Sequence, residues 1–172
     1  DLEGKVIGSV SRYHLISNYK KKIILVDHVE KGQSVDGIDE AEIVEIIDHH
    51  RVADIQTNGP LYFRSEPIGS TSTIVGKMFF ENGIRPSRGA AGLLVGAIIS
   101  DTLLFRSPTC TPVDKNICLK LAEIAGIEVE SFAQEMFKAG TSLKGKTVEQ
   151  IFNSDFKPFN MEDFKVGIAQ VN

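Results

Sequence analysis

Two apolar segments of the chain each end in an aspartate followed by a histidine. Residues 23–26 lead into Asp27 and His28, and residues 43–47 lead into the Asp-His-His-Arg sequence of residues 48–51. Both segments are typical of buried strands in a parallel sheet. Ligands of open α/β sheets lie outside the carboxyl ends of the strands. Carboxylate and imidazole groups delivered there together predict a site for divalent metal ions.

The individual side chains leave alternatives open. A carboxylate such as Asp27, directly after four apolar residues, is costly to bury unless it is paired or bound to a metal. In isolation it would indicate a turn cap, but the second Asp-His segment favours the metal. Neighbours on an extended chain point in opposite directions. We therefore expect only one of His49 and His50 to face the metal, while the other contacts the substrate or supports a ligand.

Asp101 is a third candidate carboxylate. It follows the small apolar stretch of residues 90–100, which contains Gly92 and Gly96. Glycine costs a helix about 1 kcal/mol relative to alanine, so these two glycines predict close packing against a neighbour. At the end of such a buried helix, Asp101 either places a carboxylate at depth or caps the next segment, and spacing alone leaves both open.

Strands followed by helices predict an α/β fold, a mainly parallel sheet flanked by helices. Further strands are expected at residues 5–10 and 61–66, and at 165–172 as a strand whose partners do not follow it. A small, polar stretch at residues 140–145 predicts a hinge. Helical patterns cover residues 12–16, 74–80, 88–100, 112–125 and 129–138.

Composition narrows the functional class. The 172 residues carry a formal net charge of −4, which argues against a general nucleic-acid-binding surface. The two cysteines are too few for a disulfide framework. No apolar segment is long enough to span a membrane, and no signal segment opens the chain. We therefore expect a cytoplasmic protein with neither nucleic-acid nor membrane partners.

The mixture of carboxylate and imidazole ligands suits Mn²⁺, Co²⁺, Mg²⁺ or Zn²⁺. Two such ions a few ångströms apart can clamp the attacking and leaving oxygens of a phosphoryl transfer. The Gly-Ser-Thr-Ser-Thr sequence of residues 69–73 offers backbone N–H groups and hydroxyls to an anion, although Ser and Thr are also ordinary helix caps. Nucleophilic catalysis is less favoured, because no Ser-His-Asp order is present.

The chain contains, in this order, Val26-Asp27-His28, residues 48–51, residues 66–71, Ser100-Asp101, residues 107–111 and residues 138–140. Together these segments resemble the family II, manganese-dependent inorganic pyrophosphatases of the DHH phosphoesterase superfamily. The resemblance runs from about residue 20 to the end of the chain. The Asp-His-His triplet indicates only the superfamily, whereas the Ser-Pro-Thr-Cys-Thr segment and the Lys-Ala-Gly hinge indicate the pyrophosphatases.

The resemblance implies hydrolysis of pyrophosphate to two phosphates by a two-metal mechanism. It implies that Asp27 bridges two metals and that His49 and Asp101 bind one of them. His50 and Lys157 would contact the substrate. The metals would be Mn²⁺ or Co²⁺, with Mg²⁺ as an additional or substitute ion, and the protein would form a homodimer.

Departures from the family pattern predict the domain organisation. The opening His-x-Asn-Pro-Asp-x-Asp segment is absent, and Val29 replaces a frequent asparagine. We expect residues 1–17 to be the tail of a CBS regulatory domain. Residues 18–140 would be a DHH catalytic domain that lacks its N-terminal metal-binding strand. Residues 141–172 would be the hinge and the start of a DHHA2-type domain. Such a segment is expected to belong to a longer enzyme, controlled by adenine nucleotides, and to be inactive alone.

Two other functions remain open at this stage. One is a DHH phosphodiesterase that acts on short oligonucleotides or cyclic dinucleotides. The other is a non-catalytic regulatory or oligomerisation fragment. Competition between pyrophosphate and a dinucleotide would separate the two enzymes, and nucleotide binding without turnover would identify the fragment.

Overall fold

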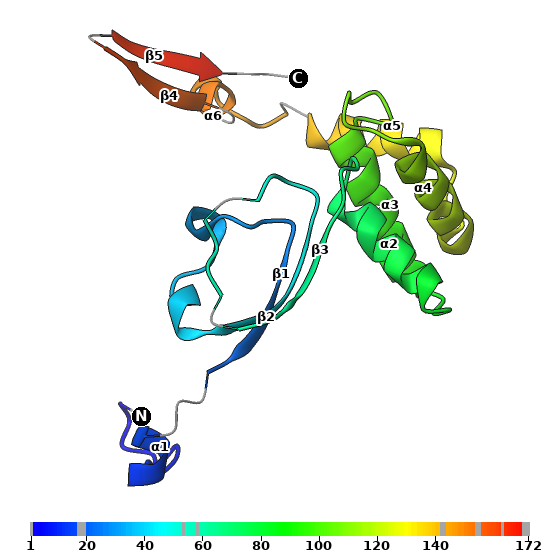
Figure 1. Cartoon of the computed structure of the whole chain (residues 1–172). Coiled ribbons are helices and arrows are strands. Elements are labelled where there is room, and N and C mark those ends of the chain that lie inside the picture. Colours follow the sequence, from blue (N-terminus) through cyan, green and yellow to red (C-terminus); the bar gives the residue numbers. More distant parts are fainter. Residues whose placement is uncertain are drawn as a thin grey trace.

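The fold is built around a small parallel sheet in the computed structural model of the chain (Figure 1). The structure describes residues 2–16, 20–52, 54–57, 59–141, 144–153, 156–162 and 164–169. Strands β1 (Lys22–Val26), β2 (Glu42–Asp48) and β3 (Tyr62–Ser65) lie in that order and run parallel. The predicted parallel sheet is confirmed, and the carboxyl ends of all three strands meet at one edge.

Four helices follow the sheet, with boundaries close to those that the sequence predicts. They are α2 (Thr71–Glu81), α3 (Arg88–Thr102), α4 (Pro112–Ala125) and α5 (Val129–Gly140). Each begins at a side chain that accepts a backbone N–H, and these caps are Ser70, Ser87, Thr111 and Glu128. Such caps satisfy orphan donors of the first helical turn. Gly126, with φ +67°, ends α4 in the left-handed conformation that glycine adopts easily.

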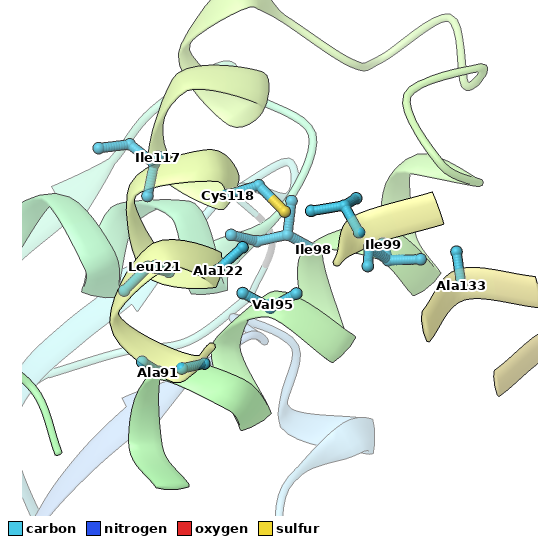
Figure 2. Packing of buried hydrophobic residues seen from close by; sticks show 11 residues of the cluster. Ala91, Val95, Ile98, Ile99, Ile117, Cys118, Leu121, Ala122 and Ala133 are labelled. Atoms are coloured by element: carbon cyan, nitrogen blue, oxygen red, sulfur yellow. The ribbon is translucent and has the colours of Figure 1, made fainter. Parts of the chain in front are cut away.

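Two clusters of buried side chains join these helices to the sheet and to one another. Ile47 of β2, Ile68 and Ile74 form one cluster, which places α2 against the sheet. The larger cluster joins α3, α4 and α5, and includes the fully buried Val95, Ile98, Ile99 and Leu121 (Figure 2). Since Ile47 directly precedes Asp48, the first cluster holds the carboxyl end of β2 against α2.

The tightest contact that a glycine allows between two helices is at Gly76. A Cβ at Gly76 of α2 would lie 2.7 Å from Ile117 Cγ2 of α4. At Gly92 and Gly96 of α3, a Cβ would meet its nearest neighbour at 3.4 Å and 3.7 Å, which is ordinary contact. Gly92 and Gly96 therefore do pack against neighbours, as expected, but at distances that an alanine would tolerate, and the tightest approach is between α2 and α4.

The two ends of the described chain differ from prediction. Helix α1 (Arg12–Ile16) is present, but residues 5–10 form no strand, and Val6 and Ile7 are almost fully exposed. An alternating pattern makes a strand only where a neighbour offers hydrogen bonds. The last strand, β5 (Phe164–Ala169), does have a partner, because β4 (Phe156–Met161) pairs with it in an antiparallel hairpin. A short helix, α6 (Val148–Asn153), precedes that hairpin. Residues 170–172 of the predicted strand lie outside the described residues.

None of the described helices combines the length and the apolar composition that crossing a lipid bilayer requires.

Candidate metal centre

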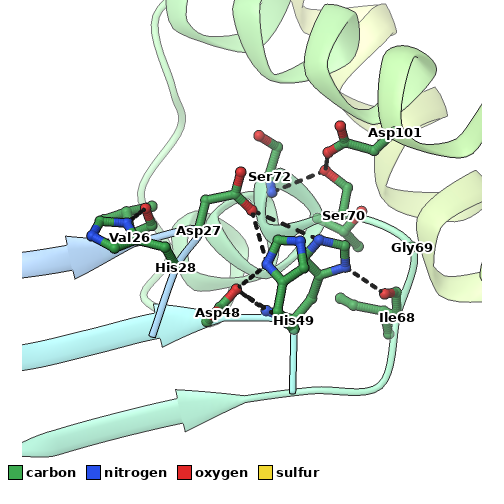
Figure 3. A network of polar contacts seen from close by, with 12 residues as sticks. Val26, Asp27, His28, Asp48, His49, Ile68, Gly69, Ser70, Ser72 and Asp101 are labelled. Atoms are coloured by element: carbon green, nitrogen blue, oxygen red, sulfur yellow. Dashed lines mark hydrogen bonds and ion pairs between the residues drawn. The ribbon is translucent and has the colours of Figure 1, made fainter. Parts of the chain in front are cut away.

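The carboxyl edge of the sheet brings three potential metal ligands together (Figure 3). Asp27 follows β1, while His49 and His50 follow β2. One ligand atom from each lies within 4.8 Å of the other two. His49 Nε2 is 3.7 Å and His50 Nδ1 is 3.9 Å from Asp27 Oδ1. A carboxylate between two imidazoles is a donor set that suits Mn²⁺, Co²⁺ or Zn²⁺.

Asp27 reaches this position through an unusual backbone conformation. Its φ is +68°, in the left-handed region, while its N–H still donates to the Ile47 carbonyl at 3.0 Å. Asp27 therefore turns away from the strand direction at the point where β1 ends. Left-handed non-glycine residues cluster at functional sites, where the surrounding structure holds them in place.

The two histidines do not point in opposite directions, so that expectation was wrong. Strand β2 ends at Asp48, and the chain then bends. Asp48 Oδ1 accepts the N–H of His49 at 2.7 Å, the N–H of His50 at 3.1 Å and the His50 Nδ1–H at 2.8 Å. This fully buried carboxylate draws both residues back over the strand end. The two ring centroids are consequently only 4.1 Å apart.

A backbone carbonyl fixes which nitrogen of His49 is free. His49 Nδ1 lies 2.9 Å from the Ile68 carbonyl oxygen. That oxygen can only accept a hydrogen bond, so Nδ1 must carry the proton. The lone pair of the neutral ring is then on Nε2, the nitrogen that faces Asp27. His49 is thus prepared to bind a metal.

Asp101 lies in the last turn of α3 and is not a member of the three-residue group. Its Oδ2 accepts a hydrogen bond from the Ser70 hydroxyl at 2.6 Å. The residue is exposed rather than placed at depth. Of the three metal ligands that the sequence predicts, the structure therefore brings Asp27 and His49 together, and it holds Asp101 by a serine of the adjoining loop.

Lys157 lies elsewhere in the chain. It is an exposed residue of β4 and pairs in register with Ile168 of β5. Its role as a substrate contact stays a prediction.

A buried aspartate behind the site was not singled out by the sequence reasoning. Asp114, in the first turn of α4, is fully buried and forms a capping box with Thr111. Burial alone would raise the pKa of this carboxyl, but hydrogen bonds from Thr73, Thr111 and the Gly69 N–H lower the pKa below its usual value. The Thr-x-x-Asp spacing is a capping signal that could have revealed it. Its bonds to Gly69 and Thr73 carry no sequence signal, because they join residues more than 40 positions apart.

An ionic cluster ties β3 to α2 on the other side of the loop. Arg64 Nη1 and Nη2 donate to the two carboxylate oxygens of Glu81 at 2.5 and 2.8 Å, and Arg64 Nε donates to Glu66 at 2.9 Å. Lys77 also donates to Glu66. Burial opposes ionisation of Glu66, but the bonds from Lys77 and Arg64 lower its pKa overall. The ion pairs with Arg64 and Lys77 therefore hold Glu66, the first residue of the loop 66–70, in place.

One hollow of the described chain lies away from the metal ligands. It has a volume of about 780 Å³ and lies at the amino ends of β1 and β2, where Lys20, Glu42 and Ile43 contribute to its lining. None of the predicted site residues lines it.

Comparison with known proteins gives concordant matches. Residues 4–98 match the DHH family, N-terminal domain, and residues 134–172 match the DHHA2 domain. The chain is 73% identical over all 172 residues to a cobalt-dependent inorganic pyrophosphatase of Clostridium perfringens, of which it covers 31%. It is 64% identical over 149 residues to a probable manganese-dependent inorganic pyrophosphatase of Clostridium acetobutylicum; this match covers 87% of the chain and 48% of that protein.

A solved structure agrees with these matches. The fold is similar to the crystal structure of a putative family II inorganic pyrophosphatase of Methanococcus jannaschii, with a TM-score of 0.72 and 46% identity. That match covers 90% of this chain and 54% of the other. The chain therefore spans between about a third and half of the length of these relatives.

Proposed function

Because the chain belongs to the DHH family, we propose that it is part of an enzyme that hydrolyses inorganic pyrophosphate to two phosphates. The observation that carries the proposal is the convergence of the Asp27 carboxylate with the free Nε2 of His49. The names of the two clostridial relatives support the same substrate. The proposed activity is that of a hydrolase acting on a phosphoanhydride bond.

The residues at the sheet edge fit a divalent metal. Asp27 offers a carboxylate, and the proton on His49 Nδ1 leaves Nε2 unprotonated, as a metal ligand must be. We propose Mn²⁺ or Co²⁺, in line with the names of the relatives, with Mg²⁺ as an additional or substitute ion. Metals bound there would polarise phosphoryl oxygens and lower the pKa of an attacking water.

The side chains are assigned complementary roles. Asp27 would bridge two ions, and His49 and Asp101 would bind one of them, Asp101 being steadied by Ser70. His50 donates its Nδ1–H to Asp48, so we assign its Nε2 to the substrate or the leaving phosphate. The Lys157 ammonium would neutralise charge on pyrophosphate.

The domain organisation and partners are part of the same proposal. Residues 1–17 would be the tail of a CBS domain that binds adenine nucleotides, residues 18–140 the catalytic domain, and residues 141–172 the hinge and start of the DHHA2 domain. The 172 matched residues are 31% of the Clostridium perfringens relative, whereas the 149 matched residues are 48% of the Clostridium acetobutylicum relative. The first relative is therefore much longer than the second. This difference supports an inserted domain in the longer relative.

We further propose that the protein is a cytoplasmic homodimer. Cys110 and Cys118 are both free thiols, as is usual in a reducing compartment. A two-fold axis at an edge of the three-stranded sheet would pair two subunits. Light scattering of the full-length protein tests the dimer, and calorimetric titration with AMP and ATP tests nucleotide binding.

The activity is tested by phosphate release from pyrophosphate by the full-length protein that contains this chain. We expect turnover with Mn²⁺ or Co²⁺, and a loss of at least about 100-fold in His49→Ala, because a metal ligand is removed. His14→Ala is the matched control, since this histidine lies in α1 and pairs with Ser11. No turnover of pyrophosphate by the parent, or full activity in His49→Ala, would refute the proposal.

A further inference from the structure

Residues 68–70 form a short loop that makes hydrogen bonds to two of the proposed metal ligands (Figure 3). The Ile68 carbonyl accepts the His49 Nδ1–H at 2.9 Å. Two residues later, the Ser70 hydroxyl donates to Asp101 Oδ2 at 2.6 Å. His49 follows a strand and Asp101 ends a helix, yet both depend on residues 68–70. Whatever fixes this loop therefore orients both ligands.

Asp114 fixes the loop at its centre. Its Oδ2 accepts the Gly69 N–H at 2.9 Å, between the two residues that contact the ligands. The same oxygen accepts the N–H and the hydroxyl of Thr111, both at 2.7 Å, and Oδ1 accepts the Thr73 hydroxyl at 2.6 Å. The side chain is fully buried. With four donors and no exposure to water, this carboxylate has one orientation available.

The backbone of the loop also lies directly against this carboxylate. A Cβ placed on Gly69 would be 3.1 Å from Asp114 Oδ2 and 2.8 Å from Thr102 Cγ2. Glycine is therefore the residue that allows the N–H of position 69 to reach the aspartate. A helix cap would require only the bonds to Thr111, whereas two of the four donors come from Gly69 and Thr73, outside α4 and its cap.

We propose that Asp114 is a positioning residue of the metal centre, which clamps Gly69 and so sets Ile68 against His49 and Ser70 against Asp101. The inference rests on the proposed function in taking His49 and Asp101 as metal ligands. Asp114 contacts neither of them and is not a catalytic residue. Partners that orient metal ligands typically change metal affinity about 10–100-fold when mutated.

The test compares Asp114→Asn with Glu128→Gln in the 172-residue chain. An amide at position 114 presents an NH₂ group to N–H donors that need an acceptor, so the clamp on Gly69 loosens. Glu128 is the matched control, because its carboxylate also caps a helix and accepts the N–H groups of Glu130 and Ser131. Two properties are measured: the His49 ring tautomer in the metal-free chain, by ¹⁵N NMR, and Co²⁺ affinity, from visible absorption.

We expect Asp114→Asn to bind Co²⁺ about 10–100-fold more weakly and to lose the single Nδ1–H tautomer of His49. Glu128→Gln should match the unsubstituted 172-residue chain in both measurements. A folded Asp114→Asn chain with the parent's tautomer and affinity would overturn the proposal. If the unsubstituted 172-residue chain, which lacks the predicted N-terminal metal-binding strand, bound no Co²⁺, the His49 tautomer alone would decide the role of Asp114, while turnover by the full-length protein would still test the proposed function.

A second variant covers the case in which Asp114→Asn lacks the parent's helical circular dichroism. Thr111→Val removes the hydroxyl that donates to Asp114 Oδ2 and accepts the Asp114 N–H, and leaves the hydrogen bonds from Gly69, Thr73 and the Thr111 N–H to the carboxylate. A smaller shift in the same direction, with the fold kept, would support the proposal. Loss of the helical signal in this variant too would make Asp114 a folding residue only, and would overturn it.

Discussion

The close approach of α2 and α4 makes opposite predictions for two glycine-to-alanine substitutions. Gly76 and Gly96 both lie inside helices. At Gly76 a new methyl would lie 2.7 Å from Ile117 Cγ2 and 3.0 Å from Leu121 Cδ1. Ile117 is 8% exposed and Leu121 is fully buried, so neither can move aside freely. At Gly96 the nearest atom is Phe132 Cε1, at 3.7 Å.

The expected free energies follow from two terms. Replacing glycine with alanine inside a helix stabilises it by about 1 kcal/mol, and this gain applies at both positions. Overpacking of a filled core costs about 1–3 kcal/mol, and this cost applies only at Gly76. Gly96→Ala should therefore stabilise the chain by about 1 kcal/mol. Gly76→Ala should range from neutral to about 2 kcal/mol destabilised.

Thermal unfolding followed by circular dichroism at 222 nm measures the difference. For a chain of this size, 1 kcal/mol corresponds to about 2–4 °C in Tm. We expect Gly96→Ala to melt above the parent and Gly76→Ala to melt below Gly96→Ala. Because the propensity gain is common to both, their difference isolates the packing term. Equal increases in Tm for the two variants would refute the close contact between α2 and α4.

Three further predictions concern the site and its supports. Asp27→Gly should be about 1 kcal/mol more stable to urea than Asp27→Ala, because alanine keeps a Cβ at φ +68°; equal midpoints would contradict the strain. Burial raises the pKa of Glu66, but the hydrogen bonds from Lys77 and Arg64 outweigh it and lower this pKa overall. The ionised Glu66 carboxylate therefore contributes its full stabilisation above the pKa of an unfolded glutamate, and this stabilisation is lost as the pH falls through the lower pKa of the folded state. Urea midpoints between pH 7 and pH 3 should consequently fall less in Glu66→Gln than in the parent, and parallel curves would argue against this. Co²⁺ should raise the Tm of the parent but not of His49→Ala, and an equal rise would locate binding elsewhere.

The sequence predicts the framework of the site because strand ends and ligand types are local signals. Apolar segments at 23–26 and 43–47 mark buried strands, and Asp27 and His49 come together because parallel strands end at one edge. The direction of His50 was predicted wrongly. It depends on a bend that Asp48 imposes with its own side chain, and an extended strand gives no sign of it.

Long-range contacts account for the rest of what the sequence does not reveal. Thr111 and Asp114 carry a recognisable capping pattern, but nothing local indicates that the aspartate also holds Gly69. Strand β4 was missed because its residues acquire strand structure only by pairing with β5. The exposed residues 5–10 show the reverse case, an alternating pattern without a neighbour to pair with.

The parallel pairing of β1 with β2 has a consequence for how quickly the chain refolds. Leu25 pairs with Ile46, so a loop of about 20 residues must close before the first ladder bond forms. The hydrogen bonds inside each helix join residues only about four positions apart, and short-range contacts form faster. We expect stopped-flow refolding to recover the helical circular dichroism early and the Co²⁺ absorption band late. The band requires Asp27 and His49 to be close together, and this happens only when the carboxyl ends of β1 and β2 are in place.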